Sequence, residues 1–445
     1  METTSRPLFI ILSNWILYGQ LIDPYKEFFI EIRDDINDNE IWTERYNLIT
    51  TNIPMFLSKD VVIKIFEIGK CINFIQKYFD EPNFSLMKLK KKFEEEISKA
   101  ENNINSNKMD LDSEKDKENQ MKLNYNFINN NNNYSENILR YKKALNLLQK
   151  FEDVNNLNFL ILPEIYSEID AIHKEINKEL MKILFEKFKF MQHLQSINAY
   201  LLLGQGDLWT YLMELLYDEL KKPANQIYKH NLLGFLDSAI KASNAQYHDV
   251  ECLKKLNVKL LDSSMGDTGW DIFVMDYFID SPLTCIFSKD LMQKYQTLFF
   301  FFWKIKRLEY TQNHQVWRNF MTYSHEFKQS WDSLRPFIHK SILFNQKIMH
   351  FTSNLHSYFT LEVLENQYKK LITKIKKIEY LDDLIELHKN FVEEVTNRSL
   401  LNYENSLIYK KIIEIFDLIF RFKSSQVINL IFLYLILPKL IFRKF

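Results

Sequence analysis

The feature that most constrains the fold of this chain is its scarcity of turn residues. Only seven glycines and nine prolines occur among 445 residues. These two residue types most often end helices and form tight turns. The chain instead contains 36 phenylalanines and 23 tyrosines. Few turn residues and many large side chains favour long helices, so we predict a mostly α fold that is large enough for two or three domains.

Charge and cysteine content exclude several classes of protein. The formal net charge of -1 at pH 7 argues against a polybasic nucleic-acid-binding protein. Three widely separated cysteines indicate neither a disulfide framework nor a cysteine zinc site, which favours a reducing, cytosolic setting. The apolar run Val427–Leu437 stops at Pro438 and is shorter than the roughly 20 residues that a membrane helix needs. No membrane association is expected.

Helical spacing of apolar residues organises most of the chain. Residues 62–75 form one apolar face, and Ile165 to Leu194 continue a second pattern that predicts one long helix ending at Gly204. Asp207 is a candidate N-cap for the next helix, which Pro223 would end. Between these patterns, residues 83–137 are charged and rich in asparagine, and we predict a disordered insert.

Further along the chain, Ser288 is expected to cap another long helix. Its aromatic run Phe299–Trp303 is closely followed by lysines and arginine, so core packing is the expected role.

One stretch departs from the helical pattern. "SSMGDTGWDIFVMDYFIDSPL", residues 263–283, places two of the seven glycines within four positions. β-branched and aromatic residues flank the segment Gly266–Gly269. We predict two strands joined by a short turn, a small β-hairpin in a helical domain.

A search for catalytic or ligand-binding motifs is mostly negative. "LLLGQGD" lacks the third glycine of a dinucleotide fingerprint and the Gly-Lys-Ser/Thr of a phosphate loop. The histidines lack metal-ligand spacing, and the spacing of Asp267 and Asp271 is too common to indicate a carboxylate pair. Asp382, Asp383 and His388 fit a solvated helix start. We therefore expect no enzyme, no metal and no cofactor.

A series of segments in fixed order is more specific than any single motif. "AYLLLGQGDLWTYLMELL", "KPANQIYKHNLLGFLDSAIKASNAQY", "LNVKLLDSSMGDTGWDIFVMDYFIDSPL" and "FFFFWKIKRLEY" follow one another closely. "PLFIILSNWILYGQLIDPYKEFFI" precedes them, and "YLDDLIELHKNFV" follows. "IPMFLSKDVVIKIFEIGKCINFI", residues 53–75, also belongs to the series. Together they resemble the gamma-tubulin complex component family over most of the chain. All seven glycines fall inside these segments: Gly19, Gly69, Gly204, Gly206, Gly234, Gly266 and Gly269.

The resemblance implies elongated helical-bundle domains in tandem. Residues 1–82 correspond to the latter part of an N-terminal domain that makes lateral contacts, and 138–164 to a connecting helix. Residues 165–445 correspond to a C-terminal domain that binds gamma-tubulin. The chain begins almost directly on a motif that family members reach after a long N-terminal region, so much of the lateral-contact domain is expected to be missing. From about Gln426 the family pattern is lost.

The function implied by the resemblance is a non-enzymatic scaffold for microtubule nucleation. Its expected partners are gamma-tubulin and neighbouring complex components, and its expected location is a cytoplasmic microtubule-organizing centre such as a spindle pole. The alternative is a helical adaptor that does not bind tubulin.

Twelve residues in family-like motifs are candidates for gamma-tubulin binding. Trp270 remains open between an interface and a core position, because both environments favour large aromatic side chains. The same division applies to the other candidates. They are Gly204, Gly206, Asp207, His230, Asn231, Gly266, Asp267, Gly269, Trp270, Asp271, Lys306 and Arg307.

Overall fold

The computed structural model describes residues 2–33, 41–55, 57–78, 162–264, 266–316, 331–402 and 406–441. The predicted insert at 83–137 and most of the connecting helix at 138–164 lie outside these ranges. The chain divides into two compact units. Unit 1 contains residues 1–188 with 280–285 and 379–383, and unit 2 contains residues 189–279, 286–378 and 384–445.

Unit 1 is a small helical body with one two-stranded sheet. Its elements are α1 (Glu2–Tyr18), β1 (Ile30–Ile32), α2 (Ile41–Glu44), β2 (Tyr46–Leu48), α3 (Lys59–Tyr78) and α6 (Leu162–Glu186). β1 and β2 pair antiparallel, with Ile30 opposite Leu48. The apolar face predicted over residues 62–75 is confirmed, since Val62, Ile65, Ile68, Ile72 and Ile75 are all buried.

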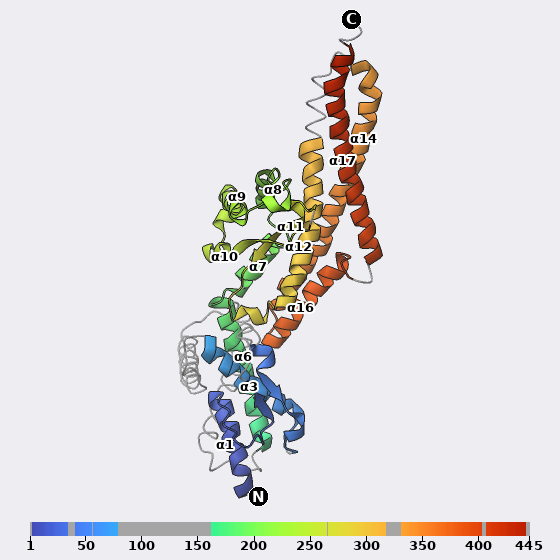
Figure 1. The fold of residues 1–445 in the computed structure, drawn as a ribbon. Coiled ribbons are helices and arrows are strands. Elements are labelled where there is room, and N and C mark those ends of the chain that lie inside the picture. The colour runs from blue at the N-terminus through green and yellow to red at the C-terminus, as the bar shows by residue number, and fades with distance from the viewer. Residues whose placement is uncertain are drawn as a thin grey trace, which may run out of the picture. The chain divides into compact units, whose positions relative to one another are not determined.

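Unit 2 contains the remaining helices and a second two-stranded sheet (Figure 1). Its first part comprises α7 (Phe190–Tyr200), α8 (Gly206–Leu216), α9 (Lys229–Ala242), α10 (Val250–Lys254), β3 (Leu256–Leu260), α11 (Gly269–Ile272) and β4 (Phe273–Tyr277). Its second part comprises α12 (Lys289–Tyr310), α14 (Trp331–Ser357), α15 (Asn366–Ile375), α16 (Leu381–Arg398) and α17 (Ser406–Ile441). The first three residues of α16 belong to unit 1. The mostly α fold with a small β element is confirmed.

The single helix predicted from Ile165 to Gly204 is wrong. α6 ends at Glu186 and α7 begins at Phe190, because Lys189 adopts a left-handed conformation with φ 49° and ψ 39°. The Nζ of Lys189 donates to Asp249 Oδ2 at 2.7 Å and to Glu251 Oε2 at 2.9 Å. These contacts accompany the break, and the apolar periodicity carries no trace of it.

The β-hairpin is confirmed, but its connection is not a short turn. β3 and β4 pair antiparallel from Leu256–Tyr277 to Leu260–Phe273. Trp270 and Asp271, expected in the second strand, lie instead in α11. Thr268 precedes α11 and forms a capping box with Asp271, whose Oδ2 accepts from the Thr268 amide at 3.1 Å. This local capping favours a helical turn before the strand.

Other local predictions have mixed outcomes. Ser288 caps α12, since its Oγ accepts from the Leu291 amide at 3.4 Å. Asp207 is not the N-cap of α8, because Gln205 occupies that position and Asp207 lies within the first turn. α8 also ends at Leu216, well before Pro223.

Aromatic residues form the core of unit 2. Trp303 of α12 packs against Trp209 of α8 at 5.6 Å and against Phe273 of β4 at 5.1 Å between ring centroids. The ring of Phe299 stacks on Trp303 with an interplanar angle of 16°. The predicted core role of Phe299–Trp303 is confirmed, since only Phe300 among these residues is not fully buried.

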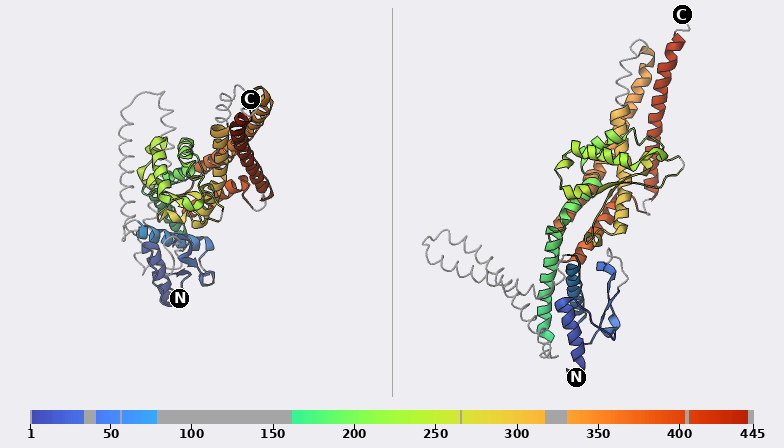
Figure 2. Two further views of the ribbon diagram at one scale, coloured as in Figure 1. Left: turned by 45° about the horizontal axis from the view of Figure 1, so that its top comes forward. Right: turned by 60° about the vertical axis from the view of Figure 1, so that its left-hand side comes forward.

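Two further views show the long helices of unit 2 (Figure 2). α14 and α17 run side by side along much of their lengths in Figure 1 and in the left view of Figure 2. Among the helices that the structure describes, none combines the length and the apolar character that crossing a bilayer would require.

Candidate protein-binding surfaces

The loop before α11 is held by its own polar groups. Asp267 Oδ2 accepts from the Ser264 amide at 2.7 Å, and the Asp267 carbonyl accepts from the Ala224 amide at 3.0 Å. Gly266 is exposed and has φ +100°, a conformation that favours glycine. The carboxylate of Asp271 is exposed and also accepts from Thr268 Oγ1 at 2.8 Å. These contacts fix the conformation of the loop and leave Gly266 and Asp271 exposed to solvent.

Gly269 allows this loop to pack tightly against the segment after α8. A Cβ at position 269 would lie 2.8 Å from Leu220 Cα and 2.3 Å from Ile227 Cδ1. The Gly269 amide donates to the Lys222 carbonyl at 3.2 Å. A side chain at this position would separate the two segments.

Trp270 and Arg307 are brought together in the interior of unit 2. Trp270 is 4% exposed and lies 5.6 Å from Trp303 between ring centroids. The Arg307 guanidinium carbon lies 4.7 Å from the Trp270 ring centroid and 4.5 Å from that of Phe420 in α17. Burial lowers the pKa of Arg307, and the nearby Asp271 carboxylate opposes this change. Arg307 therefore joins α11, α12 and α17 by stacking between two rings.

A second group of candidates lies at the start of α8. Gly204 and Gly206 are exposed, and Asp207 is half-buried. Asp207 Oδ2 accepts from the Asn244 amide at 2.8 Å, and its Oδ1 accepts from the Leu208 amide at 2.9 Å. Burial opposes ionisation of Asp207, but these amide donors outweigh it and lower the pKa of the carboxyl. Asp207 thus connects the start of α8 to Asn244, two residues after the end of α9.

His230 and Asn231 form a third group, at the opposite end of the α8–α9 pair. Both are exposed in the first turn of α9. The imidazole of His230 stacks on Tyr228, which is also exposed, with ring centroids 5.7 Å apart. Because Asp207 contacts the far end of α9, this group and Asp207 lie at opposite ends of the helix pair.

Lys306 is directed differently from its neighbour Arg307. Its Nζ donates to Glu309 Oε2 of the same helix at 3.0 Å.

The twelve candidates do not converge on one point. Trp270 and Arg307 are in direct contact, the residues around Gly266 share one loop, and the remaining groups lie apart.

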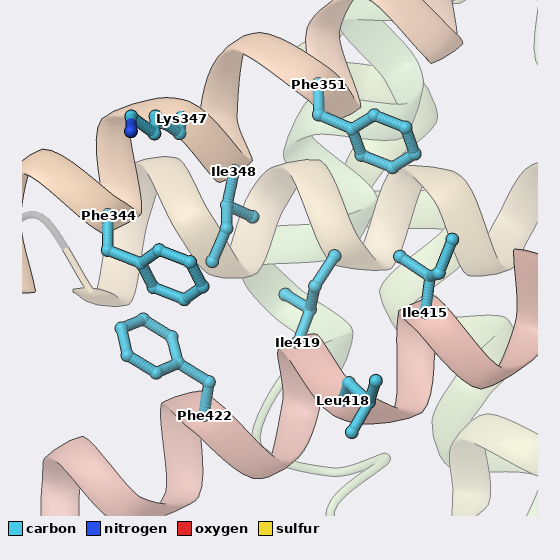
Figure 3. Close-up of a pocket in the computed structure, with 8 residues that line it drawn as sticks. All are labelled: Phe344, Lys347, Ile348, Phe351, Ile415, Leu418, Ile419 and Phe422. Atoms are coloured by element: carbon cyan, nitrogen blue, oxygen red, sulfur yellow. The ribbon is translucent and has the colours of Figure 1, made fainter.

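Sequence reasoning missed an apolar groove between α14 and α17 (Figure 3). It has a volume of about 400 Å³. Its walls carry Phe344, Lys347, Ile348 and Phe351 from α14 and Ile415, Leu418, Ile419 and Phe422 from α17. The apolar spacing of both segments is visible in the sequence, but spacing alone does not distinguish a buried helix face from an exposed one.

Comparisons with known proteins agree with the division into two units. The family model "Gamma tubulin complex component N-terminal" matches residues 1–187, and "Gamma tubulin complex component C-terminal" matches residues 190–433. The two matched ranges meet where units 1 and 2 divide, at Phe188 and Lys189.

Similar proteins carry the same family name or a spindle-pole name. The chain is 36% identical over 431 residues to "Spindle pole body component 98" of Dictyostelium discoideum, covering 96% of this chain and 50% of that protein. It is 30% identical to the "Gamma-tubulin complex component 3 homolog" of Xenopus laevis, covering 94% of this chain and 40% of that protein. It is 29% identical to human "Gamma-tubulin complex component 3", covering 96% and 41% respectively.

The chain thus spans half or less of the length of these relatives. Nearly the whole chain is nevertheless accounted for by the two family models and by relatives with consistent names. The similarity described from the ordered sequence motifs is confirmed, and the chain belongs to the gamma-tubulin complex component family.

Proposed function

We propose that this chain is a scaffold subunit of a gamma-tubulin complex, which binds gamma-tubulin and helps to template microtubule nucleation at microtubule-organizing centres. The observation that carries the proposal is the match of unit 2 to the C-terminal family model over residues 190–433. Expected partners are gamma-tubulin and other components of the complex, packed side by side. The expected location is cytoplasmic, at the spindle pole or an equivalent centre.

The proposed role is preorganisation rather than catalysis. A scaffold that holds gamma-tubulin in a fixed orientation lowers the entropy cost of arranging subunits when a microtubule starts. Guanine nucleotide would then be bound by gamma-tubulin. No step of this mechanism needs a cofactor or a catalytic residue on this chain.

The twelve candidate residues divide into two proposed roles. We propose that six residues, all of them exposed, contact gamma-tubulin: Gly204, Gly206, His230, Asn231, Gly266 and Asp271. The less accessible residues Asp207, Asp267, Gly269, Trp270, Lys306 and Arg307 hold the loops and helices that present them. The exposed residues at the start of α8 and those at the start of α9 lie at opposite ends of the α8–α9 pair. α8 is about 16 Å long by its residue count, so one globular partner is large enough to reach both of these groups.

Co-purification with gamma-tubulin from one expression host tests the proposal. We expect stoichiometric recovery with the full chain and at least tenfold lower recovery with the double variant His230→Ala/Asn231→Ala. Lys389→Ala, an exposed change on α16, is the matched control and should leave recovery unchanged. Circular dichroism confirms that each variant is folded.

Failure of a folded chain to recover gamma-tubulin would leave the helical adaptor as the better description. Localisation is a second readout, because a nucleation subunit concentrates at spindle poles whereas an unrelated adaptor does not. Normal recovery with the double variant would instead remove His230 and Asn231 from the proposed surface.

A further inference from the structure

The groove between α14 and α17 exposes more apolar surface than isolated surface residues explain. Large contiguous apolar patches on a folded protein usually mark binding sites. Four residues on its walls keep much of their side chains in solvent: Phe344 at 51%, Phe351 at 40%, Ile415 at 40% and Leu418 at 61%.

The two walls, α14 and α17, run antiparallel, so that the start of one lining segment lies beside the end of the other. The ring centroids of Phe344 and Phe422 are 4.8 Å apart at an interplanar angle of 80°, which closes one end of the groove. Figure 3 shows Ile348 directed toward Ile419, with Phe351 and Ile415 further along. The apolar side chains line a trough between the two helices, and Lys347 stands at its rim.

Further exposed apolar residues occur along the same part of the chain beyond the groove. Phe301 of α12 contacts both Phe359, just after α14, and Tyr409 of α17, at centroid distances of 5.0 and 5.8 Å. At this level both segments pack against the same ring of α12. Exposed apolar residues occur here as well: Tyr358, Leu361, Leu407 and Ile408. From Phe344 to Leu361 the strip corresponds to about five helical turns.

The charges beside the groove itself are mainly basic, although Asp417 of α17, next to Leu418, is exposed as well. α14 contains no acidic residue after Asp332, and its Lys340 and Lys347 are exposed. Among the described residues neither lysine forms an ion pair. Arg421 of α17 is exposed beside the groove residues Leu418 and Phe422, whereas the acidic Glu414 is already paired with Lys411 at 2.7 Å. An occupant with carboxylates along its edges complements these cations.

We propose that this groove binds one amphipathic helix of a partner protein, with a continuous apolar stripe flanked by aspartate or glutamate. An apolar stripe at positions i, i+3, i+4 and i+7 fits a trough between two helices. The exposed cations Lys340, Lys347 and Arg421 favour a helix with acidic residues beside its apolar stripe. This partner is distinct from gamma-tubulin, whose proposed contacts lie around α8 and α9.

The probe for this site is a labelled 18-residue peptide with leucine at the stripe positions and glutamate beside them. A twin peptide carries lysine in place of each glutamate. Fluorescence anisotropy with the full chain should give at least tenfold tighter binding of the glutamate peptide. That preference should weaken as salt is raised, because exposed charges are screened.

Matched variants locate the site. Leu418→Asp should reduce binding of the glutamate peptide at least tenfold, and Lys347→Glu should reduce or reverse the preference between the two peptides. Leu215→Asp changes a leucine on α8 that is 40% exposed, and it should leave binding unchanged. Thermal melts confirm that each variant is folded.

Several outcomes would overturn the inference. They are absence of binding, equal binding of the two peptides, and equal loss with Leu215→Asp and Leu418→Asp. Self-association that Leu418→Asp abolishes would assign the groove to a second copy of this chain. Loss of gamma-tubulin recovery with Leu418→Asp would assign it to gamma-tubulin. Retained recovery of gamma-tubulin with loss of peptide binding supports two separate surfaces.

Discussion

His388 is a fully buried imidazole held in one hydrogen-bonded arrangement. Tyr295 lies with its hydroxyl 2.9 Å from His388 Nε2, and the Ile286 carbonyl lies 3.2 Å from Nδ1. The carbonyl is an acceptor, so Nδ1 donates to it and neutral Nε2 accepts from the tyrosine hydroxyl. Burial lowers the pKa of His388 to about 4, although the carbonyl contact opposes this shift. The sequence-based assignment of residues 382–388 to a solvated helix start is therefore wrong for His388.

A defined pH dependence of stability follows from this low pKa. Below pH 6.5 the unfolded chain takes up a proton on His388 that the folded chain does not take up until about pH 4. Stability is thus present above pH 6.5 and lost as the pH falls toward 4. We expect His388 to contribute a loss of about 2 kcal/mol between pH 7 and pH 5.

Urea unfolding at the two pH values measures this loss. His388→Gln should show a smaller drop than the unmodified chain by that amount, even if it is less stable at both values. His350→Gln, at an exposed histidine of α14, should retain the full drop. An equal drop in all three proteins would show that His388 does not titrate as described.

Two glycines of unit 2 are predicted to respond oppositely to the same substitution. Gly269→Ala places a Cβ 2.8 Å from the Leu220 Cα, so backbone must shift, at a cost of about 1–3 kcal/mol. Gly234→Ala lies inside α9, where the added Cβ meets no atom within 4 Å apart from the adjacent backbone of its own helix. Alanine there should raise the free energy of unfolding by about 0.5–1 kcal/mol, because it restricts the unfolded chain and favours helix.

Chemical denaturation of the two single variants checks this pair. Equal effects in the same direction would contradict the packing around Gly269 described here. Co-purification of gamma-tubulin with the folded fraction of Gly269→Ala separates a structural role of Gly269 from a binding role.

At the scale of elements, Arg307 is the link between α11, α12 and α17. We expect Arg307→Ala to accelerate amide hydrogen exchange in α11 and in α17 around Phe420, corresponding to a loss of about 1–3 kcal/mol. The reason is that its guanidinium stacks between the rings of Trp270 and Phe420. Arg307→Lys should recover only part of the loss, since an ammonium group has no planar face to stack.

The neighbouring variant Lys306→Ala provides the control for Arg307. Lys306 pairs with Glu309 within α12, and such a pair is worth a few tenths of a kcal/mol. Hydrogen exchange in α17 should then stay close to that of the unmodified chain. Similar acceleration in both variants would mean that α12 as a whole, rather than the stacked arginine, holds α17.

At the scale of the whole molecule, unit 1 is completed by residues far along the chain. Trp42 of α2 donates from Nε1 to Asp382 Oδ1 at 2.6 Å, across 340 positions of sequence. The Nζ of buried Lys70 lies 3.8 Å from Asp382 Oδ2 and 4.1 Å from the centroid of the Trp42 ring. The Asp382 carboxylate thus accepts from the buried Trp42 indole and lies close to the buried Lys70 ammonium group.

We expect Asp382→Ala to destabilise unit 1 by about 1–3 kcal/mol. The change leaves the Trp42 indole N–H without its acceptor and removes the carboxylate nearest to Lys70. Tryptophan fluorescence and thermal melts of the full chain measure the effect. Glu386→Ala, an exposed acid on the same helix, should change the melting temperature by much less.

Features that depend on a few neighbouring residues were predictable from the sequence. The apolar face of α3, the Ser288 cap of α12 and the burial of Phe299–Trp303 all follow from periodicity or capping within one or two helical turns. The mostly α class follows from the same signals, repeated along a chain that is poor in turn residues.

The sequence by itself therefore determined the helical class, most helix positions and, through its ordered motifs, the family. The tertiary structure alone decided the break at Lys189, the burial of Trp270, its contact with Arg307 and the exposure of the α14–α17 groove. The physical reason is the distance along the sequence over which each kind of interaction acts. Capping and periodicity act between residues close in sequence, whereas whether an apolar face is buried depends on elements that meet only after the chain has folded.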